Sequence, residues 1–86
     1  MSIEGAVVRE QGVTFAIAIV KPHVLNTTGQ ANEAIGSFRR VFSGMPVVLM
    51  AQDASGRPRY YGHQDIVNFL ASVPLTAIPW KRYELN

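Results

Sequence analysis

The side chains best suited to chemistry or binding gather in two short segments. Each segment combines cations with large aromatic rings: Arg57, Arg59, Tyr60 and Tyr61 in the first, and Trp80, Lys81 and Arg82 in the second. Tyr, Trp and Arg dominate the binding energy of many protein interfaces. Rings between cations can also stack on nucleic-acid bases while the cations meet phosphates. We therefore expect these seven residues to form one binding surface, for a protein partner first and for nucleic acid as the alternative.

A structural role for the same residues also remains open. Aromatic side chains on strands commonly pack across neighbouring strands, and Arg residues beside them keep a sheet edge soluble. Solvent exposure of the rings is the property that separates the two interpretations.

The two histidines are the groups that acid–base catalysis would use near neutral pH. His23 follows an apolar run in Lys21-Pro22-His23, at the end of a strand where open α/β sheets often place functional groups. His63 and Asp65 are two positions apart, which does not put them on one helix face as a metal pair requires. We predict no metal and no cofactor; an enzyme using His23 or His63 is the third candidate function.

Several classes of chemistry are excluded by what the sequence lacks. Cysteine is absent, which removes disulfides, thiol nucleophiles and thiolate metal ligands. The seven glycines are scattered singly and form no phosphate-binding loop. No serine lies in a nucleophile elbow. A non-enzymatic binding module, indifferent to redox conditions, is therefore the predicted function.

Composition predicts one small globular domain over residues 1–86. Hydrophobic residues make up 48% of the chain and charged residues 16%, and the net charge of +2 is only a modest basic excess. The longest apolar stretch, residues 13–20, is far shorter than the roughly 20 residues that span a bilayer, and the N-terminus lacks a secretory pattern. We expect a soluble, cytoplasmic protein with no membrane partner, alone or as a homo-oligomer.

The first half of the chain predicts a hairpin followed by a helix. Two runs of β-forming residues, 3–10 and 13–24, are separated by Gln11-Gly12, which suits a tight turn. The second run is apolar or small on both faces, as in a central strand.

A capping box at Thr27 and Gln30 marks the start of the helix. Its apolar residues recur at intervals of three and four, and we expect Ile35 and Phe38 to face the sheet. Gly44 suits the C-terminal end of this helix.

The second half predicts a buried strand at residues 46–52, reached by a crossover and therefore parallel to the strand before the helix. A short edge strand at 57–61, a helix between residues 63 and 73, and a final strand at 80–85 follow.

This order, ββαββα(β), predicts an α+β protein with a mixed sheet of four to five strands and two helices on one face, a two-layer sandwich. A strand–helix–strand crossover would set the last strand parallel to and near the strand at 57–61, which would unite the two clusters.

The segment from Met45 to Leu70 contains Pro46 before a strand, a short returning strand that ends at Gly62, and then a helix. This pattern resembles the distal strand–strand–helix half of the thioredoxin fold, and it implies a thioredoxin-like sheet as the alternative architecture. Thiol–disulfide exchange does not follow from the resemblance, because the chain has no cysteine.

Overall fold

The computed structural model describes residues 2–10 and 12–84 and confirms the α+β class and the predicted order of elements. These are β1 (Ser2–Glu10), β2 (Val13–Ile19), α1 (Thr28–Val41), β3 (Val47–Gln52), β4 (Pro58–Tyr61), α2 (Gln64–Leu70) and β5 (Lys81–Glu84), with 3-10 turns η1 (Pro22–Leu25) and η2 (Leu75–Ala77). Gln11 in the predicted first turn and Leu85 in the predicted last strand lie outside the described residues.

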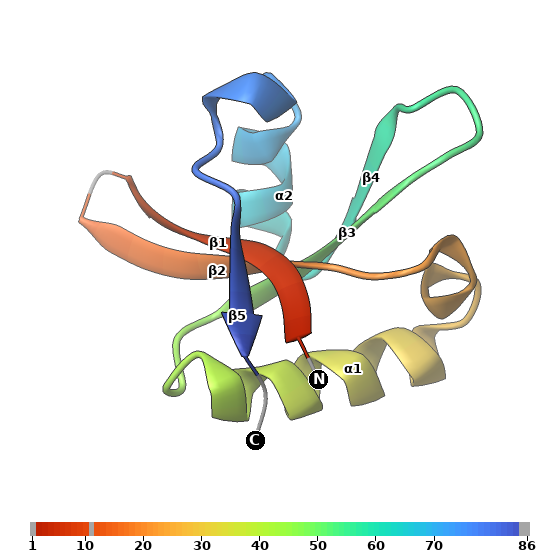
Figure 1. The fold of residues 1–86 in the computed structure, drawn as a ribbon, viewed down its shortest axis with the longest axis horizontal. Helices are drawn as coiled ribbons and strands as arrows, with labels where there is room; N and C mark the ends of the chain where they lie inside the picture. The colour runs from red at the N-terminus through yellow and green to blue at the C-terminus, as the bar shows by residue number, and fades with distance from the viewer. Residues whose placement is uncertain (1, 11, 85–86) are drawn as a thin grey trace.

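The strands form one mixed sheet in the order β4-β3-β2-β1-β5 (Figure 1). β2 and β3 are parallel, as predicted from the helical crossover between them, and every other neighbouring pair in this sheet is antiparallel. β2 therefore occupies the centre, in agreement with its two apolar faces.

The two helices lie on opposite faces of the sheet, so the expected two layers are in fact three. Phe15 and Ile17 of β2 pack in the cluster that α2 covers, whereas Ala16 and Ala18 pack in the cluster that α1 covers. Figure 1 shows α1 below the sheet and α2 above it. The physical reason is the double-sided apolar character of β2, since one helix layer would have left half of these side chains in water.

The last strand also departs from expectation. β5 pairs antiparallel with β1 and lies at the opposite edge of the sheet from β4, not beside it. β4 is short and begins at Pro58, whose missing N–H weakens it as a partner for another strand. The long β1 instead offers its outer side to β5.

α1 begins and packs largely as its sequence predicts. Thr27 Oγ1 accepts a hydrogen bond of 3.2 Å from the Gln30 backbone N–H, which confirms the cap. Ile35 and Phe38 pack against the core on this face but remain partly exposed. The apolar stripe of α1 therefore faces the sheet as predicted, although Ile35 and Phe38 are not fully buried.

β1 changes partner at Gly5. It pairs with β2 from Gly5 to Glu10 and with β5 from Ser2 to Gly5, and Figure 1 shows it curving between the two. A Cβ atom on Gly5 would collide with the carbonyl oxygen of Ile17 and would also lie 3.5 Å from the ring of Phe42. Glycine is therefore required here by close approach of the neighbouring strand.

We predict that Gly5→Ala lowers the free energy of unfolding by about 1–3 kcal/mol, because the added methyl group must displace backbone. Gly36→Ala is the matched control. Gly36 lies within α1 with nothing within 4 Å of its Cβ position, so this change should stabilise by about 0.5–1 kcal/mol. Urea unfolding of both variants measures the difference. Equal stability of the two variants would show that β2 does not constrain Gly5.

Candidate functional site

The first predicted cluster lies at the β4 edge of the sheet and is divided between its two faces. Arg57 and Arg59 are exposed. Tyr61 faces α1, where its hydroxyl donates a 2.9 Å hydrogen bond to Asn32 Oδ1. Tyr60 faces α2 and packs against the core on that side. The two rings therefore do not form one platform.

Arg57 also has a structural role, because its backbone closes the β3–β4 turn. Asp53 Oδ1 accepts hydrogen bonds from Ser55 Oγ at 2.7 Å and from the Arg57 backbone N–H at 2.9 Å. The Ser55 bond and then the Arg57 bond hold the pKa of the Asp53 carboxyl below its ordinary value.

The second predicted cluster lies at the β5 edge. Trp80 packs against the core under α2 and donates from Nε1 to the Leu75 carbonyl at 3.0 Å. Lys81 and Arg82 are exposed, and Lys81 Nζ lies 6.0 Å from the ring centroid of Tyr83. The expected single surface for all seven residues is therefore wrong, since three strands separate the β4 and β5 edges. The prediction required a parallel crossover from β4 to β5, whereas β5 pairs antiparallel with β1.

Arg82 instead belongs to a hollow between β1 and β2. The last paired residues of these strands at this end are Gly5 and Ala18. Continued by one residue, the same register would pair Glu4 with Ile19, but the strands have separated. The next pairs in that register would be Ile3 with Val20 and Ser2 with Lys21. The residues of all three unformed pairs line the hollow.

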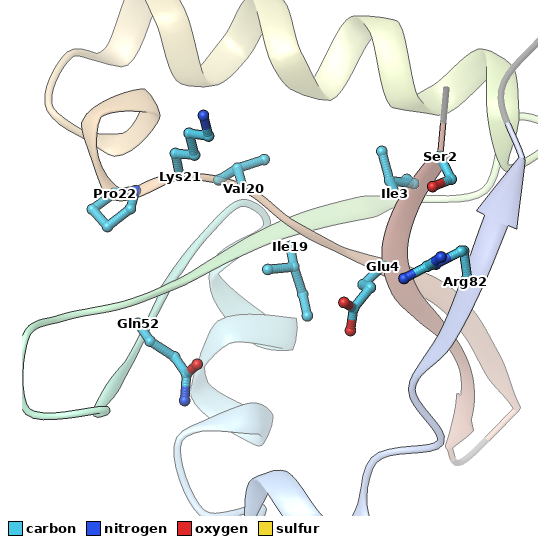
Figure 2. A pocket seen from close by; sticks show the side chains of 9 residues that line it. All are labelled: Ser2, Ile3, Glu4, Ile19, Val20, Lys21, Pro22, Gln52 and Arg82. Carbon is cyan, nitrogen blue, oxygen red and sulfur yellow. The ribbon is translucent and has the colours of Figure 1, made fainter.

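The hollow has a volume of about 510 Å³ and is open to solvent. Figure 2 shows the side chains that line it. They are Ser2, Ile3, Glu4, Ile19, Val20, Lys21, Pro22, Gln52 and Arg82. The residues from β2 and β3 come from the carboxyl ends of the two parallel strands, the position at which open α/β sheets commonly hold ligands.

The charged groups of the hollow are two cations and one carboxylate. Glu4 and Arg82 are directly opposite each other on paired strands, and Figure 2 shows Arg82 reaching toward Glu4. Lys21 follows the end of β2 and is exposed. With two cations against one carboxylate among its lining side chains, the hollow carries an excess positive charge.

Sequence reasoning identified Arg82 and the Lys21 segment but missed the β1 side of this hollow. Gly5 was the available signal, because an isolated glycine within a strand marks a bend or a close backbone approach. No local pattern in Ser2, Ile3 or Glu4 shows that these residues leave β2.

No known protein family, curated protein or solved structure matches this chain. The resemblance to the thioredoxin fold consequently rests on the order β3, β4, α2 alone, which is present as predicted. The hollow must be interpreted from its own residues.

The histidines lie apart from this hollow. His23 is exposed in η1 and is not among the lining residues. His63 precedes α2 and lines a different cleft, of about 410 Å³, together with Glu10, Asp65 and apolar side chains. Within residues 2–10 and 12–84, no group of three or more His, Asp and Glu side chains could hold a metal ion. Neither helix of this described part is long and apolar enough to cross a membrane.

The Tyr60 hydroxyl is buried without a hydrogen-bond partner, and burial raises the pKa of Tyr60 above its ordinary 10.0. We predict that Tyr60→Phe is at least as stable as the parent at neutral pH, by up to about 1 kcal/mol, because it removes an unsatisfied polar group. Above pH 10.0 the unfolded tyrosine ionises before the folded one, so the parent should lose further stability relative to the variant. Urea unfolding at both pH values tests this. A destabilised variant would mean that the hydroxyl has a bonding partner.

Proposed function

We propose that this chain is a non-enzymatic protein-binding module that receives an acidic, extended segment of its partner in the hollow between β1 and β2. The observation that carries the proposal is the separation of the two strands beyond Gly5 and Ala18, while each remains part of the sheet through its other neighbour. Strand edges that face a gap supply backbone donors and acceptors to a visiting chain.

The apolar side chains of the hollow support a polypeptide ligand. Ile3, Ile19 and Val20 are all partly exposed and come from both sides of the gap. An extended segment alternates its side chains above and below its backbone. Apolar side chains on such a segment would therefore find contacts on either side of the gap.

The charge of the hollow supports an acidic partner. Lys21 and Arg82 outnumber Glu4, and the two cations come from different segments, Lys21 from just beyond the end of β2 and Arg82 from β5. Complementary charge favours the correct partner and disfavours basic ones. Of the seven residues in the predicted surface, Arg82 belongs to the proposed site, where Lys21 is the second cation.

The nucleic-acid alternative lacks a continuous stacking platform. Tyr61 packs on the α1 side of the sheet, whereas Tyr60 and Trp80 pack against the core on the α2 side. The Trp80 indole N–H is already bonded within the chain, to the Leu75 carbonyl. Base stacking between cations needs exposed rings on one surface. This function remains as an outcome of the experiment below.

The test is a titration of isotope-labelled protein, followed by amide chemical shifts, with a blocked pentapeptide of alternating glutamate and leucine. We expect shifts at the residues that line the hollow. Lys21→Gln combined with Arg82→Gln should weaken binding at least about tenfold, since hydrogen bonds to charged groups are stronger than neutral ones.

Arg57→Gln combined with Arg59→Gln is the matched control, because it removes the same charge at the opposite edge of the sheet. Binding by this control should equal that of the parent. Equal losses in both double variants would indicate unspecific attraction and contradict the proposal. Tighter, strongly salt-dependent binding of a single-stranded oligonucleotide would favour the nucleic-acid alternative.

A further inference from the structure

The outer side of β1 is only half covered. β5 pairs with β1 from Ser2 to Gly5, whereas β1 continues to Glu10. In the part of the chain that the structure describes, no strand pairs with the outer side of residues 6–10. These residues form, with the first part of β2, the hairpin that projects to the left in Figure 1.

The hydrogen bonds of β2 determine which backbone groups of β1 face outward. The N–H groups of Ala16 and Val20 donate to carbonyls on the β3 side, at 2.8 and 2.9 Å. Successive residues of a strand direct their backbone groups to alternate sides, so Phe15 and Ile17 face β1. Their partners on β1 are residues 8 and 6. Ala6 and Val8 therefore direct their backbone groups toward β2. The alternate residues of β1, Val7 and Arg9, direct their N–H and C=O groups away from β2.

The other two edges carry features that discourage pairing with another chain. The outer side of β4 has Pro58 and Arg59, and β5 has cationic side chains at Lys81 and Arg82. The open stretch of β1 has no proline, its two charged side chains, Arg9 and Glu10, are of opposite sign, and it carries Val7, a large hydrophobic residue that is 37% exposed. This stretch is the least protected edge of the described sheet.

We propose that the open stretch of β1 pairs antiparallel with the same stretch of a second copy of this chain, across a two-fold axis at Val8. Only a register centred on Val8 places Val7 opposite Arg9 in both halves of the pair. Two opposed residues whose backbone groups face each other exchange both hydrogen bonds. The outward groups of Val7 and Arg9 are thereby satisfied in both copies.

The side chains fit the same register. Val8 meets Val8 of the other copy, Val7 meets the aliphatic part of Arg9, and Ala6 meets Glu10. No like charges are directly opposed, which a self-pairing edge must avoid. A two-fold interface requires a surface that is complementary to itself, and this edge meets that requirement.

Sedimentation equilibrium up to millimolar protein tests the proposal, and we expect the average mass to rise with concentration toward twice the monomer. Val7→Pro removes an N–H that makes no hydrogen bond to β2, and should weaken dimerisation by about tenfold or more, because the N–H is lost in each copy. Val7→Lys is the second variant, for the case in which proline disturbs the fold. It should weaken dimerisation similarly, because a lysine on an edge strand discourages pairing with another chain. Val13→Lys is the control, since Val13 is the other exposed valine of the hairpin, at 49%, but belongs to β2.

A mixed sample of labelled and unlabelled protein supplies the positive signature, a contact between the α-protons of Val8 in the two copies. A monomer at every concentration would overturn the proposal. So would a dimer that Val7→Lys and Val13→Lys weaken equally, or one without the Val8 contact. The outcome is independent of peptide binding in the hollow, which uses the other end of β1.

Discussion

The missing side chain of Gly5 is the constraint on which the arrangement of this molecule depends. The carbonyl of Ile17 occupies the space that a Cβ atom would need, and the ring of Phe42, just after α1, lies above the same point. Tyr83 of β5 packs edge-on against Phe42 at a centroid distance of 5.0 Å. One position therefore joins the central strand, the C-terminal end of α1 and the last strand.

The bend at Gly5 divides β1 into two halves with different roles. The half before Gly5 leaves β2, runs with β5 and forms one wall of the hollow that holds Glu4, Arg82 and Lys21. The half after Gly5 stays with β2 but has no partner on its outer side in the described chain. A straight β1 paired along its whole length with β2 would close the hollow.

Local patterns predicted the elements well, because their causes are local. The Thr27 and Gln30 cap, the apolar spacing of α1 and the β3–β4 turn each depend on residues a few positions apart. The two apolar faces of β2 also indicate that both sides of the sheet are covered, and the helices lie there. The position of β5 depends on which sheet edge is left open after the other strands have paired, and no pattern in residues 81–84 encodes that. The candidate site could not be assembled for the same reason, since Arg82 reaches Glu4 only through the pairing of β5 with β1.

The pairing of β1 with β5 also has a kinetic consequence. Ser2 is opposite Glu84, so the loop that this contact closes contains nearly the whole chain. Such a non-local contact is entropically costly to form and slows folding. Until β5 arrives, a growing chain leaves the outer side of β1 open along its full length, and one wall of the hollow lacks the strand that supports it. The hairpin, α1 and the β2–β3 pair can assemble before that moment, whereas the hollow takes its shape only when the last strand is in place.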